Sequence, residues 1–85
     1  MFTNKAHNGR NNLCGTVIEQ KRKELQKSQR QLADMLQIAG LDIDKNAIQR
    51  IEAGKRFVTD IELVYFSKVL QLSYEELLKA ESFFE

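Results

Sequence analysis

Helix-start signals recur along this chain of 85 residues and constrain its secondary structure more than any other feature. Three segments fit the capping box, in which a Ser or Thr hydroxyl bonds the backbone three residues on and a Glu or Gln there reaches back. These segments are Ser28–Gln31, Thr59–Glu62 and Ser73–Glu76. Thr16–Glu19 fits too, although Asn12 could start that helix one turn earlier. Asp44 is a further candidate cap, and Ile43 and Ile48 are spaced to pack across it. The pattern predicts a series of short helices.

The spacing of these signals predicts five helices, near residues 13–26, 28–39, 45–53, 60–70 and 74–83. Gly40 and Gly54 stand where a left-handed residue would end the second and third helices. No run of four or more residues alternates cleanly between apolar and polar, so strands are not expected. Apolar residues at the helical period predict a core of Val17, Ile18, Leu25, Leu32, Leu36, Ala39, Ile48, Ile51, Leu63, Phe66, Leu70, Leu77 and Leu78. The expected fold is all-α, a compact five-helix bundle.

The amino-terminal stretch differs from the rest of the chain. Residues 1–12 are polar, contain a glycine and show no apolar period, so we expect a flexible N-terminal arm. Residues 13–85 are expected to form one domain. Lys5 and Arg10 of the arm are either disordered or within reach of a nucleic acid.

The composition argues against several functional classes. One Cys and one His exclude a disulfide framework and a Cys-based structural zinc site, and no residue cluster suggests a metal, a cofactor or an enzyme. Cys14, without a partner, is interpreted as a buried or half-buried thiol rather than a redox sensor. No apolar run approaches the roughly 18 residues of a membrane span, and no signal peptide is recognisable, so a cytoplasmic location is expected. A binding module fits best.

Charge is distributed unevenly along the chain. Residues 1–30 carry a net charge of +5, whereas residues 59–85 carry −4, although the whole chain has only +1. Such asymmetry is expected if one end faces a polyanion, but ordinary solvated helix surfaces would also produce it.

The predicted helix 45–53 has two chemically different faces. Ile48, Ile51 and Glu52 gather on one side at 100° per residue. The other side gathers polar residues suited to base edges in a major groove: Lys45, Asn46, Gln49 and Arg50. Asn and Gln can pair bidentately with adenine, and Arg or Lys with guanine. A polar outer face alone is common on helices, so the residues that flank this helix are needed to distinguish base recognition from an ordinary solvated surface.

Those neighbours provide two candidate phosphate-binding sites. Ser28 and Gln29 begin the preceding helix, where backbone N–H groups can meet a phosphate. Gly54, Lys55 and Arg56 follow the helix and offer backbone amides and two cations on its far side. Two phosphate contacts flanking a base-reading helix would position a helix-turn-helix unit on duplex DNA.

These residues together resemble the Cro/lambda-repressor-like (XRE) helix-turn-helix family. The resemblance covers roughly residues 14–80 and rests on SQxxLAxxL from Ser28 and IxRIExGKR from Ile48. It implies a sequence-specific double-stranded DNA-binding transcriptional regulator, a repressor, that inserts helix 45–53 into the major groove. It also implies DNA contacts by Gln29 and a structural ion pair between Arg22 and Glu52.

The chain departs from the family pattern in three places. The turn between the second and third helices is about five residues longer, with 37–41 as the surplus, which we interpret as an extra turn of helix ending at Gly40. Gln26 and Lys27 replace the usual Gly-Leu, so the first inter-helix turn is expected to be tighter or strained. Lys21 stands where the family has an apolar residue.

The carboxyl-terminal segment carries more apolar side chains than the predicted core uses: Val64, Tyr65, Val69, Tyr74, Phe83 and Phe84. We expect a homodimer through the C-terminal helix, although Phe83 and Phe84 could instead fold back over the bundle. An alternative function is a protein-interaction module, such as an antitoxin or accessory subunit, that binds its partner through the C-terminal half.

Overall fold

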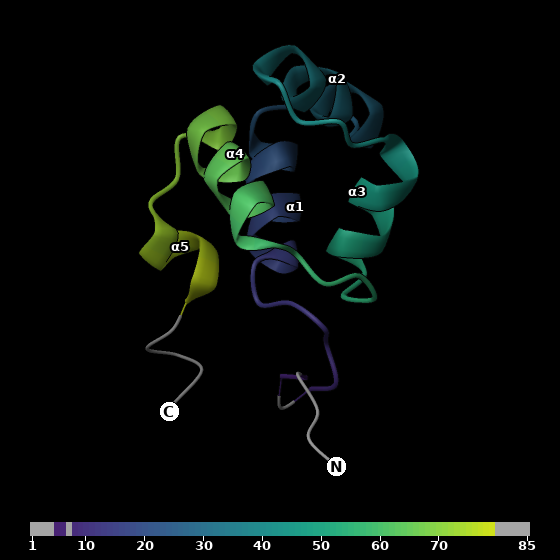
Figure 1. The fold of residues 1–85 in the computed structure, drawn as a ribbon. Helices are drawn as coiled ribbons and strands as arrows, with labels where there is room; N and C mark the ends of the chain where they lie inside the picture. The colour runs from purple at the N-terminus through teal and green to yellow at the C-terminus, as the bar shows by residue number, and fades with distance from the viewer. Residues whose placement is uncertain (1–4, 7, 80–85) are drawn as a thin grey trace.

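The computed structural model describes residues 5, 6 and 8–79, which form five α-helices and no strand (Figure 1). The helices are α1 (Gly15–Glu24), α2 (Gln29–Ala39), α3 (Lys45–Glu52), α4 (Asp60–Leu70) and α5 (Tyr74–Leu78). α1 contacts α3, α4 and α5, while α2 packs against α3 and α4. The all-α bundle expected from the sequence is confirmed.

Side-chain caps begin four of the helices. The three capping boxes are formed at α2, α4 and α5; in the first, Ser28 Oγ accepts from the N–H of Gln31 at 3.0 Å, and Gln31 Oε1 accepts from the N–H of Ser28 at 2.8 Å. Asp44 Oδ1 caps α3 by accepting from the N–H of Ala47 at 2.8 Å. Each such cap stabilises its helix by about 1 kcal/mol.

The ends of α1, α2 and α3 share one geometry. Each is followed by a left-handed residue, at Gln26 (φ 58°), Gly40 (φ 116°) and Gly54 (φ 81°). After α1, the N–H of Gln26 donates to Lys23 O and that of Lys27 to Arg22 O, the two bonds of a Schellman motif. Two of the three positions are glycine, which adopts this conformation without strain, whereas Gln26 does so at a cost. The strained first turn is therefore present in the structure.

The core lies where α1 to α4 meet and extends to α5. The buried apolar side chains among the described residues are Cys14, Val17, Ile18, Leu32, Ala33, Leu36, Ile43, Ala47, Ile48, Ile51, Phe66, Leu70, Leu72 and Leu77. Leu25 is wrongly predicted, because it follows the last residue of α1 and stays 40% exposed. Leu63 is only partly buried against the core.

Two of the predicted helices are shorter in the structure. The first helix begins at Gly15 and ends at Glu24, since Leu25 and Gln26 already form its Schellman turn. The last helix stops at Leu78, because Lys79 turns left-handed (φ 47°) and its N–H closes onto Glu75 O. Residues 80–83 of the predicted helix lie outside the described residues.

The long connection between α2 and α3 is an ordered part of the fold. α2 extends to Ala39 and Gly40 ends it, as predicted. Gln37 Nε2 then donates to Ile43 O at 2.7 Å, and Ile43 is buried in the core. The connection therefore holds the start of α3 against the bundle.

Within the predicted N-terminal arm 1–12, residues 10–12 are hydrogen-bonded to the rest of the fold. Asn12 is buried and its Nδ2 donates to Ile51 O and Arg56 O at 3.0 and 2.8 Å. The sequence shows no apolar period here because polar groups, not apolar side chains, hold the segment. Residues 1–4 and 7 lie outside the described residues.

Among the described helices, none is long and apolar enough to cross a membrane.

Candidate nucleic-acid interface

α3 separates its side chains as the sequence pattern predicts. Ile48 and Ile51 are fully buried, and Ala47 and Glu52 are buried beside them. The four candidate base-reading residues are all exposed: Lys45, Asn46, Gln49 and Arg50. The structure thus brings these four onto one solvent-facing side of a single rigid helix.

This exposed face has the chemistry that base recognition requires. The amides of Asn46 and Gln49 each offer a donor pair and an acceptor, while Lys45 and Arg50 offer only donors. An α-helix fits the major groove of B-DNA, where each base pair presents a distinct donor and acceptor pattern. The face can therefore discriminate bases as well as bind phosphate.

Arg22 and Glu52, the pair implied by the family resemblance, lie together beneath this helix. Arg22 Nε donates to Glu52 Oε2 at 2.7 Å and its NH2 group to Glu52 Oε1 at 3.0 Å, with side chains 10% and 2% exposed. The hydrogen bond that Arg22 donates to Glu52 raises the pKa of Arg22, outweighing the opposing effect of burial. A further N–H of Arg22 donates to Lys27 O at 2.7 Å, which ties the turn after α1 to the same site.

The amino terminus of α2 presents only part of its predicted phosphate-binding groups. Ser28 is exposed, but its hydroxyl and N–H are both used in the capping box. Gln29 is half-buried, and its Nε2 donates to Glu52 Oε1 at 3.0 Å. The N–H groups of Gln29 and Arg30 lie in the first turn of α2, where no carbonyl of the helix precedes them as an acceptor. They are therefore the groups able to bind an anion.

The segment after α3 is also largely committed to the protein itself. The N–H groups of Gly54 and Lys55 donate to Ile51 O and Arg50 O at 3.0 and 2.9 Å. Lys55 has an exposed side chain, so its ammonium is the group best placed for a phosphate contact. The phosphate-binding roles predicted for Gly54, Lys55 and Arg56 stay predictions, with the side chain of Lys55 the strongest.

Arg56 has a partner that the sequence pattern does not reveal. Its NH1 and NH2 groups donate to the two carboxylate oxygens of Glu62 at 3.0 and 2.9 Å, and the N–H of Thr59 adds a third bond at 2.9 Å. Burial alone would raise the pKa of Glu62, but the bonds from Arg56 and Thr59 outweigh it and lower the pKa. Glu62 was identifiable as a capping residue, and its pairing with Arg56 arises from the loop that separates them.

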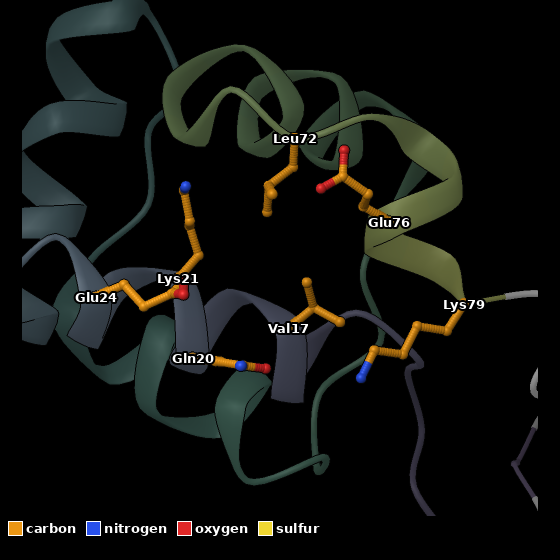
Figure 2. A pocket seen from close by; sticks show the side chains of 7 residues that line it. All are labelled: Val17, Gln20, Lys21, Glu24, Leu72, Glu76 and Lys79. Atoms are coloured by element: carbon orange, nitrogen blue, oxygen red, sulfur yellow. The ribbon is translucent and has the colours of Figure 1, made fainter.

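A shallow groove lies elsewhere, between α1 and α5 (Figure 2). It has a volume of about 420 Å³; Val17 and Leu72 face each other across it. Two bases and two acids also line it: Lys21, Lys79, Glu24 and Glu76. In the described part of the chain, no group of three or more His, Cys, Asp or Glu side chains could hold a metal ion.

The fold and this surface define a class: an all-α domain that presents one amphipathic helix next to the start of a second. The family profile described as Helix-turn-helix matches residues 18–77, well over half of the chain. The chain therefore belongs to the helix-turn-helix family of the Cro/lambda-repressor (XRE) type, whose members are DNA-binding transcription regulators. Comparison with curated proteins and with solved structures gave no match.

Proposed function

We propose that this chain is a cytoplasmic, sequence-specific repressor that binds double-stranded DNA by inserting α3, within residues 45–53, into the major groove. The observation that carries the proposal is the division of α3. Ile48 and Ile51 are fully buried and anchor the helix, while Asn46, Gln49 and Arg50 are exposed on its other side. Repression requires only that the protein occupy its DNA site, and this surface can do so without a catalytic step.

The flanking groups supply the backbone contacts. The first amides of α2, at Gln29 and Arg30, would receive one phosphate, and the ammonium of Lys55 would bind another beyond α3. Because Gln29 and α3 are joined through Glu52, the two contact regions keep a fixed separation. Such contacts orient the helix, whereas base contacts provide the sequence preference.

The proposed binding form is a homodimer. One short helix reads only a few base pairs, and each good side-chain pair discriminates by about 1–3 kcal/mol, so two copies would give a far higher preference. Tyr74, at the start of α5, is exposed and could belong to the dimer contact. Two half-sites would then lie about one helical turn apart, near 34 Å.

Selection of bound fragments from random duplex DNA tests the proposal directly. We expect one enriched motif, with affinity that falls steeply as salt rises, by a log–log slope of about 0.9 for each neutralised phosphate. The variant Asn46→Ala/Gln49→Ala should lose the enrichment, whereas Gln20→Ala, on the exposed side of α1, should keep it. A library that shows no enrichment with the unaltered protein would refute sequence-specific binding.

A second candidate is a protein-interaction role for the C-terminal half, supported by a separate surface. Ile61 and Val64 on α4 are 66% and 51% exposed and line a hollow of about 410 Å³ with Ala39, Tyr65 and Lys68. Co-purification of a partner that is lost in Val64→Asp, combined with no enriched duplex, would favour this candidate over DNA binding.

A further inference from the structure

The segment Arg10–Asn12, which we call the clasp, is hydrogen-bonded to the carboxyl end of α3 and to the loop after it. One guanidinium nitrogen of Arg10 donates to Ile51 O and Glu52 O at 3.3 and 2.9 Å. The N–H of Asn11 donates to Gly54 O at 2.8 Å, and its Nδ2 donates to Lys55 O at 3.0 Å. The clasp therefore adds donors to backbone carbonyls at the end of α3 and in the loop after it, among them Ile51 O, which also accepts from the N–H of Gly54.

Asn12 connects the same region to the start of α1. Its Nδ2 donates to Ile51 O and Arg56 O, while its Oδ1 accepts from the N–H of Gly15 at 2.9 Å. One buried amide thus joins the beginning of α1, the end of α3 and the loop toward α4. A buried, fully used polar group of this kind specifies one arrangement of the elements around it.

The clasp packs closely against two glycines. A Cβ added at Gly54 would lie 2.7 Å from Arg10 Cζ and 2.9 Å from its Cγ, so the arginine side chain lies directly on that glycine. A Cβ added at Gly15 would collide with the carbonyl oxygen of Ile51 and with Arg10 NH2. The contact between α1, the clasp and α3 therefore depends on two residues without side chains.

The bonds at the end of α3 determine the orientation in which the exposed side chains of α3 would meet DNA. Groups that recognise a ligand must be held to within about 0.5 Å and 10–20° of the productive geometry. The amino end of α3 is fixed by the cap at Asp44, and the clasp fixes the carboxyl end. Ile51 and Glu52 hold this end from the core side, and the clasp adds the bonds that orient it on the other side, next to Gln49 and Arg50.

We propose that Arg10 and Asn12 are positioning residues that set DNA sequence preference by fixing the orientation of α3. The inference rests on the proposed function. Arg10 bears a positive charge, but here it acts on the carbonyl groups of α3 and not on a DNA phosphate. That distinction can be measured, because a lost phosphate contact lowers the salt dependence of binding and a misplaced helix does not.

The test compares Arg10→Ala and Asn12→Ala with Leu72→Ala. Leu72 is buried in the core and lines the groove between α1 and α5, it makes none of the clasp's hydrogen bonds, and its truncation should lower stability. At a temperature where all variants are folded, affinities are measured for the selected duplex, for single base-pair substitutions of it and over a range of salt. The specificity ratio is the affinity for the selected duplex divided by the affinity for a duplex with one substituted base pair. We expect both clasp variants to lower this ratio about tenfold and to leave the log–log slope of affinity against salt unchanged. Leu72→Ala should keep the ratio.

Two results would overturn the proposal: an unchanged affinity ratio in the clasp variants, or a ratio that Leu72→Ala lowers equally. A fall in salt slope of about 0.9 with an unchanged ratio would instead make Arg10 a phosphate contact. Amide NMR shifts of α3 in the free protein separate this inference from DNA binding itself. Both clasp variants should change the amide chemical shifts of Gln49 to Ile51 even if no duplex is ever selected. Unchanged chemical shifts would refute the role of the clasp in orienting α3.

Discussion

The side-chain amide of Gln29 lies 3.0 Å from Glu52 Oε1, so the first residue of α2 is bonded to the last residue of α3. The same carboxylate receives two bonds from Arg22 of α1. One acidic side chain therefore fixes the relative placement of the two helices that are proposed to meet the DNA.

Replacing Glu52 should be severe for stability. Glu52→Ala leaves the guanidinium of Arg22 buried without its partner, and we expect the free energy of unfolding to fall by about 3–5 kcal/mol. Urea denaturation measures the change. The control is Glu19→Ala, which removes an exposed ion pair with Lys23 at 3.5 Å and should change stability by less than about 1 kcal/mol. Equal losses in the two variants would contradict a structural role for the buried pair.

Gln26→Gly should stabilise the protein. Gln26 is left-handed at φ 58°, a conformation that costs an L-residue about 1–2 kcal/mol. Glycine removes this strain, but its greater conformational freedom in the unfolded chain offsets part of the stabilisation. A net increase of about 0.5–1 kcal/mol is expected from thermal or urea unfolding. Gln20→Gly, inside α1, should destabilise by about 1 kcal/mol. Destabilisation by both changes would show that the turn carries no strain.

The thiol of Cys14 should limit stability at alkaline pH. Burial raises the pKa of Cys14 from 9.0 to about 11, partly offset by a backbone hydrogen bond and by Arg10. The unfolded thiol loses its proton first, so stability is full below pH 9 and falls as the pH rises toward 11, by about 2–3 kcal/mol. Unfolding of Cys14→Ala over the same pH range should lack this component. Parallel pH profiles for the two proteins would refute it.

Glu62 should contribute stability that is lost in acid. Because its folded pKa is lowered, its contribution is complete above about pH 4.5 and disappears as the pH falls through the folded value. Glu62→Gln should therefore be less stable than the parent at pH 6 and approach it near pH 3. Glu75→Gln, on exposed α5, serves as the matched control. A constant difference between parent and Glu62→Gln at every pH would exclude the ionised pair with Arg56 as the cause.

Arg50 and Lys55 should fail in different ways when truncated. Arg50→Ala should weaken binding of the selected duplex by about 1–3 kcal/mol and relax the preference at one position. Lys55→Ala should weaken all duplexes alike and lower the salt slope by about 1. Fluorescence anisotropy titrations on the selected and scrambled duplexes, over a range of salt, distinguish the two. Equal losses on both duplexes for Arg50→Ala would remove its base-reading role.

The helices were predictable because their signals are local. A capping box spans four residues, and a Schellman turn needs only a glycine or a tolerant substitute at one position, so α2, α3 and α4 could be placed closely. The buried face of α3 followed from the positions of Ile48 and Ile51 in the same way. The start of α1 was harder, since Cys14 provides no side-chain cap and Asn12 bonds the N–H of Gly15 instead.

Apart from the Arg22–Glu52 pair, which the family resemblance implies, contacts between residues distant in sequence were not predictable. Arg10 and Asn12 bond residues about forty positions away through polar groups, which leave no periodic pattern to detect. Arg56 was equally ambiguous, because a cation after α3 suits a phosphate as well as the carboxylate of Glu62 that it meets. The exposed residues proposed to read bases could be named from the sequence, whereas the groups proposed to orient them could not.

The bonds that converge on residues 51–56 bear on how small this domain can be made. A peptide cut to residues 28–56 would hold both helices of the helix-turn-helix, yet it would lack Ile18, Arg22 and the Arg10–Asn12 segment that complete the underside of α3. Such a minimal fragment should therefore be unfolded in isolation, and any synthetic DNA reader built from this protein must retain the chain from Arg10 onward.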